Sequence, residues 1–264
     1  MYVIILFLIG LFLGSIFVKL GLRLPINISL KRKSMCLNCE RELTWKEKIP
    51  IISYIIQKGK CNYCHEKISR LYIFFELLTG ILYSVVYLVF KDSYFPLEYT
   101  IFGLLVISSL IIIMVSDIKY MIIPNEVLII SSILIIIMKL YLGFLNDEIF
   151  SLLDMGYSLI FMFKDALIMF LMMLIIKKIG DLAFKKASLG GGDIKLMAFI
   201  AIFMGYKLSI VVIFLASFFA LPLSIINIHK KNEQMLPFGP YLAIATILLF
   251  LTNVDFNSLI DFIK

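Results

Sequence analysis

The sequence lacks the residue patterns of several common soluble enzymes. Its two histidines, His65 and His229, lie in predicted loops without a nucleophile elbow nearby, so a serine triad is not expected. The metal-binding helix of a zinc protease is excluded, because Ser69 stands where that motif needs its second histidine. Lys195 follows a run of glycines without a serine or threonine after it, so these glycines do not form a phosphate-binding loop.

Charged residues are also scarce. Only 16% of the 264 residues are charged, 62% are hydrophobic, and the mean hydropathy is +1.03. Soluble domains have roughly 45–50% apolar residues, so this composition indicates an integral membrane protein. The apolar runs, of which residues 99–116 are an example, lack the alternation of barrel strands. Helices are therefore expected, because a helix satisfies its own backbone hydrogen bonds within the bilayer.

Eight apolar runs are candidates for membrane-spanning helices. The first, residues 1–18, has no basic segment before it and no small-residue cleavage site, which favours an uncleaved helix with its N-terminus outside over a signal peptide. The other runs lie near 71–90, 99–116, 127–145, 157–176, 194–206, 208–228 and 238–254. The run at 194–206 rises only about 20 Å against a hydrocarbon core of about 30 Å, so we expect it to use part of the preceding glycine turn or to be sheltered by its neighbours. The sequence thus predicts an all-α membrane protein, a polytopic bundle of about eight transmembrane helices.

Basic residues are concentrated in alternate loops. Most of the 25 lysines and arginines lie in four segments, namely 23–70, 117–126, 177–195 and 229–237. The loops between these segments carry only Lys91 and Lys264. The positive-inside rule therefore predicts that the four basic segments are cytoplasmic. A basic face beside anionic membrane lipid accounts for the net charge of +7, so no nucleic-acid partner is expected.

One sizeable polar loop contains all four cysteines, Cys36, Cys39, Cys61 and Cys64. Two C-x-x-C pairs at this separation are typical of a tetrahedral four-thiolate zinc site, which is structural rather than catalytic. Disulfides are disfavoured in the predicted cytoplasmic location. The alternatives are another thiophilic metal, four reduced thiols or a redox pair. His65 directly follows Cys64 and is a further candidate ligand, but an exposed loop histidine is the simpler interpretation.

Two aspartates lie where apolar runs meet the predicted cytoplasmic face. Asp117 directly follows the run at 99–116, and Asp193 follows three glycines at the start of the run at 194–206. An acid at membrane depth is a candidate functional residue, and two carboxyl groups that approach each other can share one proton. Such a pair can activate water and protonate a leaving amine, which is the chemistry of peptide hydrolysis. The alternative for each aspartate alone is a helix cap or a solvated charge at the interface.

Three further charged residues lie within the predicted helices and rank lower. Glu76 is one turn into the second helix, where it can face a partner group. Lys164 and Asp165 lie within the run at 157–176 and can pair locally or tilt toward an interface.

At several places the sequence resembles the type IV prepilin peptidases, membrane aspartic proteases of the G-x-G-D class. The segments "GGGDIKLMA" (190–198), "SDIKYMIIPNE" (116–126) and "PFGPYLA" (237–243) are similar to the family's aspartate and P-F-G-P motifs. The amino-terminal region is similar as well, through "GSIFVKLGLRLP" (14–25), the two C-x-x-C pairs and "ELLTG" (76–80). The motifs occur in the family's order and cover essentially the whole chain.

The resemblance implies that Asp117 and Asp193 form the catalytic pair. It implies cleavage of type IV prepilin or pseudopilin precursors after a glycine, at the cytoplasmic face of a bacterial inner membrane. It further implies methylation of the new amino terminus with S-adenosylmethionine, associated with residues 1–90, whereas residues 91–264 form the peptidase domain. Residues expected to support the substrate or the active site are Gly190, Gly192, Lys195, Pro237 and Gly239.

Two positions depart from the family's pattern. Val18 stands where the family often has asparagine, and Lys119 stands where it often has a second acid after the first aspartate. Lys119 leaves the proposed pair of aspartates intact. Val18 weakens the case for methylation more than the case for cleavage. The alternatives are a related intramembrane protease with another substrate, which is not expected to carry the four-cysteine loop, and a non-enzymatic transporter whose aspartates bind ions.

Overall fold

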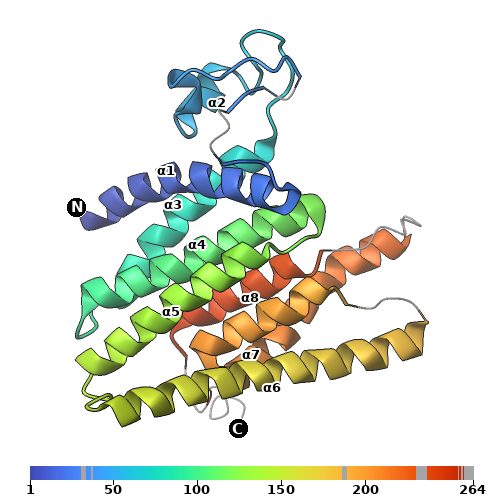
Figure 1. Ribbon diagram of the computed structural model, residues 1–264. Helices are drawn as coiled ribbons and strands as arrows, with labels where there is room; N and C mark the ends of the chain where they lie inside the picture. The colour runs from blue at the N-terminus through green and yellow to red at the C-terminus, as the bar shows by residue number, and fades with distance from the viewer. Residues whose placement is uncertain are drawn as a thin grey trace.

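The computed structural model describes residues 1–30, 34–36, 38–185, 189–229, 237–254, 256 and 258, so Lys264 lies outside the described residues. Within them the helices are α1 (Tyr2–Arg23), α2 (Ile52–Ile56), α3 (Arg70–Phe90), α4 (Pro96–Tyr120), α5 (Asn125–Leu145), α6 (Leu152–Phe184), α7 (Gly191–His229) and α8 (Gly239–Thr252). Figure 1 shows the long helices as one bundle, with α2 in a small lobe beyond the ends of α1 and α3. The predicted all-α fold class is confirmed.

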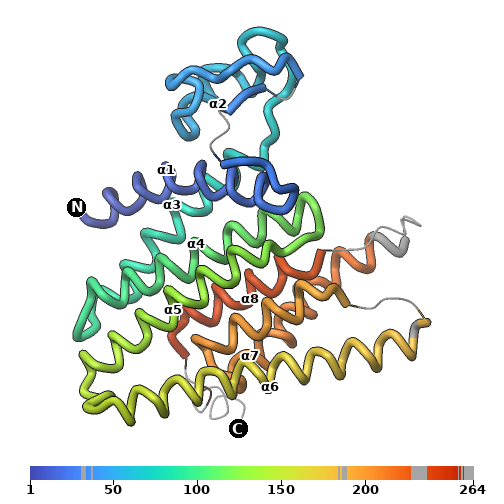
Figure 2. Tube along the Cα trace, viewed as in Figure 1, coloured from blue at the N-terminus to red at the C-terminus, as the bar shows by residue number. Residues whose placement is uncertain are grey.

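The number of membrane segments agrees with the prediction once α7 is divided. Among the described residues, six helices are long and apolar enough to span a bilayer, and α8 is a shorter apolar helix. Within α7, Gly205 has φ 78° and ψ 161°, which are not helical values. Figure 2 shows the chain turning back within α7, so that both ends of α7 lie at the same end of the bundle. The two parts of α7 correspond to the predicted runs at 194–206 and 208–228, which makes eight membrane segments.

The break at Gly205 is stabilised by charged side chains from two neighbouring helices. A positive φ favours glycine, and a helix that ends there leaves carbonyl groups without partners. The ammonium group of Lys139 in α5 donates to the carbonyls of Ile202 and Phe203, at 3.2 and 3.3 Å. A cation at a helix carboxyl end also interacts favourably with the helix dipole. From α6, Asp165 approaches so closely that a Cβ on Gly205 would stand 3.3 Å from its Oδ2.

Glycines allow α1 to pack closely against α3. A Cβ added to Gly10 would stand 2.8 Å from the Cα of Gly80, and one added to Gly14 would stand 2.9 Å from the Cα of Glu76. Small residues at such crossings let two membrane helices approach until their backbones touch. The α1–α3 pair therefore depends on these positions remaining small.

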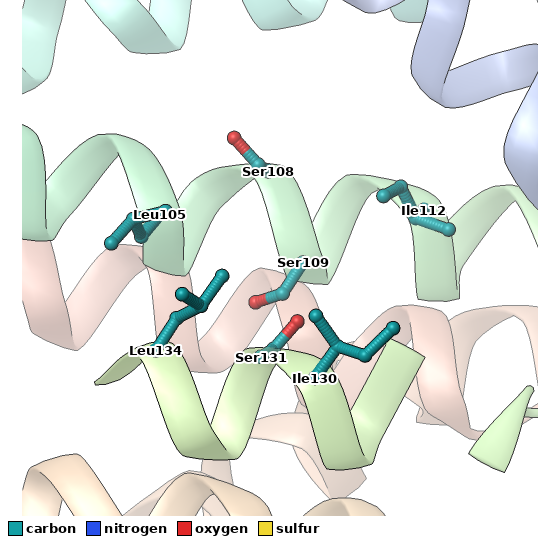
Figure 3. A pocket seen from close by; sticks show the side chains of 7 residues that line it. All are labelled: Leu105, Ser108, Ser109, Ile112, Ile130, Ser131 and Leu134. Atoms are coloured by element: carbon teal, nitrogen blue, oxygen red, sulfur yellow. The ribbon is translucent and has the colours of Figure 1, made fainter. Parts of the chain in front are cut away.

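The helix α4 is the most buried of the membrane helices, and it contacts α1, α3, α5 and α8. A groove of about 190 Å³ separates part of α4 from α5, lined by Leu105, Ser108, Ser109, Ile112, Ile130, Ser131 and Leu134 (Figure 3). The hydroxyls of Ser108 and Ser109 donate to carbonyls of their own helix. The groove contains neither of the predicted catalytic aspartates.

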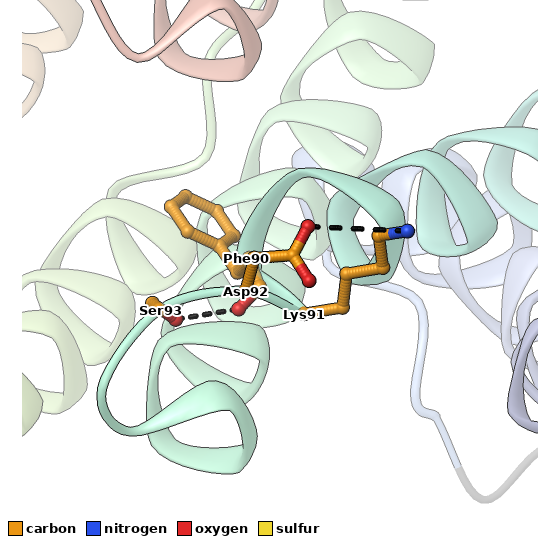
Figure 4. A network of polar contacts seen from close by, with 4 residues as sticks. All are labelled: Phe90, Lys91, Asp92 and Ser93. Carbon is orange, nitrogen blue, oxygen red and sulfur yellow. Dashed lines mark hydrogen bonds and ion pairs between the residues drawn. The ribbon is translucent and has the colours of Figure 1, made fainter.

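The turn between α3 and α4 lies at the end of the bundle opposite the α2 lobe. In this turn the Nζ atom of Lys91 lies 3.9 Å from Oδ2 of the adjacent Asp92, and the Ser93 hydroxyl donates to the carbonyl of Phe90 (Figure 4). The ion pair is exposed, so it contributes little to stability. Asp92 is 86% exposed and lies before the start of α4, whereas Asp117 lies in the last turn of that helix, which makes Asp92 a suitable site for a control substitution.

Candidate active site and metal centre

Asp117 lies in the last turn of α4, where its side chain is only 5% exposed. The helix ends just after it, because Met121 has a left-handed backbone and donates its N–H to the carbonyl of Asp117 at 2.9 Å. The hydroxyl of Ser116 donates to the carbonyl of Ile122 in the following turn. These bonds on both sides of Asp117 fix the position of its backbone.

Asp193 lies in the first turn of α7 and is 8% exposed. The backbone N–H of Gly190 donates to its carboxylate, and a Cβ on Gly190 would stand 3.0 Å from Oδ2. A negative charge is favoured in the first turn of a helix by the helix dipole. The glycine turn thus holds this carboxylate at the amino end of α7.

The two aspartates lie near each other at one end of the bundle. The charge of Asp117 acts on the carboxyl group of Asp193, and the N–H of Gly239 donates to Oδ2 of Asp117 at 3.0 Å. A Cβ on Gly239 would stand only 2.6 Å from that oxygen. The carboxyl end of α4 and the amino ends of α7 and α8 therefore converge, and Pro237 lies half-buried just before α8.

The remaining predicted support residues surround this point. A Cβ on Gly192 would stand 3.1 Å from the Cβ of Ile123, in the segment that connects α4 to α5. The exposed ammonium of Lys195 donates to Oδ1 of Asn125 at 2.9 Å, which ties the start of α7 to the start of α5. The partner of Lys195 in the structure is therefore an amide oxygen and not a carboxylate.

The four cysteines come together in the α2 lobe. Their sulfur atoms all lie within 4.8 Å of one another, with Cys36 and Cys64 at 3.6 Å and Cys39 and Cys61 at 4.0 Å. Sulfurs of a tetrahedral site with Zn–S bonds of about 2.3 Å are separated by roughly 3.8 Å. The donor set and its spacing therefore fit a zinc ion, as the sequence predicts.

Each cysteine pair lies on a similar tight turn. In the first turn the N–H of Cys36 donates to Arg41 and its carbonyl accepts from Glu40, and in the second Cys61 bonds His65 and Glu66 in the same way. The backbone N–H of Cys39 lowers the pKa of the Cys36 thiol to about 7, which favours the thiolate that a metal binds.

The second thiol of this pair behaves differently. The N–H of Arg41 lowers the pKa of the Cys39 thiol, but desolvation and the neighbouring sulfurs outweigh it and raise that pKa to about 11. The four thiols therefore do not all ionise together on their own, and metal binding must release protons.

Glu76, which ranks low by sequence, anchors the cysteine loop to the bundle. Its carboxylate is buried in α3, accepts the N–H of Ile51 at 2.9 Å and also interacts with Ser15 of α1. Ile51 has φ 60°, an uncommon conformation for a β-branched residue. An acid one turn into an apolar helix is the sequence signal for this contact, but its partners are distant in the chain.

Comparison with known proteins identifies the family of this chain. Residues 8–90 match the Bacterial Peptidase A24 N-terminal domain, and residues 104–225 match the Type IV leader peptidase family. A prepilin leader peptidase/N-methyltransferase of Bacillus subtilis is 34% identical over 263 residues, covering 98% of this chain and 96% of that protein. The chain belongs to the type IV prepilin peptidase family.

Other prepilin peptidases are more distant but similarly co-extensive. Proteins of the same name from Vibrio cholerae and Neisseria gonorrhoeae are each 28% identical, covering 94% and 90% of this chain and 96% and 80% of their own lengths. No solved structure gives a significant match. Of the two departures from the prepilin peptidase pattern, Val18 is fully buried in α1 and Lys119 is exposed at the end of α4.

Proposed function

We propose that this protein is a membrane aspartic endopeptidase with Asp117 and Asp193 as its catalytic residues. The observation that carries the proposal is that two buried carboxyl groups lie near each other, close enough for their charges to interact, where α4, α7 and α8 converge. One carboxylate acts as general base and removes a proton from the attacking water, and the other carboxyl group protonates the leaving amine. Neighbouring carboxyl groups suit both tasks because they share a single proton.

The substrates that we propose are type IV prepilin or pseudopilin precursors, cleaved after a glycine at the cytoplasmic face of a bacterial inner membrane. The names of the relatives support the substrate class. A basic leader followed by an apolar helix puts the scissile bond near the membrane interface, which is where helix ends such as these lie. Gly190, Gly192 and Gly239 add no side chain around the carboxyl groups, and Pro237 lies just before α8. Under this proposal the N-terminus lies outside.

The second proposed activity is N-methylation of the newly formed amino terminus, associated with residues 1–90, while residues 91–264 carry the peptidase. It is supported by the N-methyltransferase in the relatives' names. When bound, S-adenosylmethionine would supply an electrophilic methyl group to the new amine, with S-adenosylhomocysteine and a proton as the other products. The proposed zinc in the four-cysteine site stabilises the loop.

The test of the peptidase is cleavage of a prepilin-like substrate by D117N and D193N variants in vesicles. Each should lower kcat by about a hundredfold or more, because each removes one of the two proton-transfer groups. The control is D92N, which changes the exposed acid at the opposite end of the bundle and should cleave normally. Full-rate cleavage by either active-site variant would refute the catalytic pair.

The same assay separates the two rival functions. A wild-type protein that cuts other membrane helices but no prepilin-like substrate would be an intramembrane protease of different specificity. A wild-type protein that cuts none of them, but binds ions through the two aspartates, would be a transporter.

A further inference from the structure

The α2 lobe contains a cavity of about 310 Å³ that is separate from the two aspartates. It lies between the turn η2 (Lys46–Lys48), α2 and the second cysteine turn. Its lining combines two opposite charges, hydroxyls, amides, an aromatic ring and an aliphatic side chain, contributed by Thr44, Lys46, Glu47, Ser53, Ile56, Gln57, Asn62 and Tyr63. Its volume falls at the lower end of the range for small-molecule sites, about 300–1,000 Å³.

The carboxylate of Glu47 is held rigidly in this cavity. Its Oε2 accepts from the N–H and the hydroxyl of Thr44, at 2.8 and 2.9 Å, and its Oε1 accepts from the amide of Asn62 at 3.0 Å. The N–H of Thr44 is the main reason that the pKa of Glu47 lies below its ordinary value. An ionised carboxylate offers about four acceptor positions, so one remains for a ligand hydroxyl or ammonium group.

Tyr63 and Lys46 supply two further kinds of contact. The guanidinium of Arg41 lies 3.3 Å from the centre of the Tyr63 ring, which fixes the ring orientation, and the side chain remains 44% exposed. An ordered aromatic ring can stack on a planar base. Lys46 is exposed and offers its ammonium group to a ligand carboxylate.

These groups match a zwitterionic nucleoside. A heterocyclic base can pack against Tyr63 and Ile56. Ribose hydroxyls can donate hydrogen bonds to the carboxylate of Glu47, and an amino-acid carboxylate can pair with the ammonium group of Lys46. A nucleotide is disfavoured, because its phosphates would lie near the Glu47 carboxylate and Lys46 is the single cation among the residues that line the cavity. We infer that this cavity binds S-adenosylmethionine, with Glu47, Lys46 and Tyr63 as its recognition residues. The inference rests on the proposed methylation and names the site at which the methyl donor is held.

The cavity is also adjacent to the four-cysteine site. Asn62 and Tyr63 are the two residues between Cys61 and Cys64, so the cysteine turn sets their positions. Substitutions of the cysteines would therefore disturb the cavity and the metal site together, and they do not test the inference cleanly. Lys46 is a better choice, because its only described contact is with the neighbouring ring of Trp45, at 5.6 Å.

The test is the affinity of the purified full-length protein for S-adenosylhomocysteine, measured by calorimetry in detergent. Glu47→Gln and Lys46→Met should each weaken binding by about tenfold or more, since each removes a charge-assisted hydrogen bond. Glu66→Gln, an exposed acid on the second cysteine turn that does not line the cavity, should bind as the wild type does. Metal content and prepilin cleavage should be unchanged in all three variants.

Two outcomes overturn the inference, and they differ in what they say about methylation. If the wild type binds S-adenosylhomocysteine but Lys46→Met and Glu47→Gln bind it equally well, the methyl donor is held elsewhere and methylation stands. If the wild type neither binds it nor methylates a cleaved prepilin, the proposed methylation fails as well. If Glu47→Gln loses its metal, Lys46→Met becomes the deciding variant, because the side chain of Lys46 does not hold the loop together.

Discussion

Replacing Gly239 with alanine tests the geometry of the proposed active site most directly. A Cβ at this position would stand 2.6 Å from Oδ2 and 3.1 Å from Cγ of Asp117. Ordinary van der Waals contact begins near 3.4 Å, so the carboxylate has to move by about 0.8 Å or α8 has to shift. Either movement lengthens the 3.0 Å hydrogen bond from the Gly239 N–H.

The expected loss of activity follows from this displacement. Misplacing a catalytic group by about 1 Å can cost around a hundredfold in rate, so we expect Gly239→Ala to lower kcat/KM by between about tenfold and a hundredfold. Gly239 does not have a positive φ, so alanine adds no backbone strain and the helix should form normally. The loss in cleavage should therefore be much larger than any fall in the melting temperature.

The matched control is Gly191→Ala, two residues before Asp193. A Cβ at Gly191 meets nothing within 4 Å, so this variant adds the same methyl group near the same site without a clash. Both variants would be assayed for cleavage of a prepilin-like substrate in vesicles, over a range of substrate concentrations. Wild-type kcat/KM in Gly239→Ala would refute the reasoning, as would an equal loss in both variants.

Three further predictions follow from the same structure. Chelation of the metal should loosen the α2 lobe and change the fluorescence of Trp45, the single tryptophan. Removal of the metal should be faster at low pH because protons compete for the thiolates. An unchanged fluorescence spectrum would count against a structural metal. Gly14→Leu should separate α1 from α3 and lower the melting temperature, because its backbone contact with Glu76 leaves no room. Lys139→Met should destabilise the protein by about 3 kcal/mol, because the substitution removes the ammonium group that faces Asp165 and the buried carbonyls of Ile202 and Phe203. The control Lys91→Met changes an exposed lysine and should have little effect.

Features that depend on local sequence could be predicted well. The membrane segments follow from runs of apolar residues, since the bilayer requires each helix to satisfy its own backbone. The metal site follows from two short cysteine spacings, because a tight turn by itself directs two sulfurs at one ion. The break between the two parts of α7 is also visible, since Lys207 separates two apolar runs there, two residues after Gly205.

The candidate site was only partly predictable. Asp117 and Asp193 are identified by their position at helix ends and by the family motifs, but they are 76 residues apart in the numbering and nothing local says that their carboxyl groups meet. Gly239 is recognised through its motif, whereas the reason that it must be glycine is its contact with Asp117.

The sequence alone determined the membrane class, the eight apolar segments and the two C-x-x-C pairs, because each depends on residue type at short spacing, and the family motifs added Asp117 and Asp193 as the candidate pair. Only the tertiary structure decided which distant groups satisfy one another. It is what pairs Glu76 with Ile51, Lys139 with the carbonyls before Gly205, and Glu47 with Asn62. Burial makes an unpaired polar group costly, so such partners must exist, but which partner it is depends on how the helices pack.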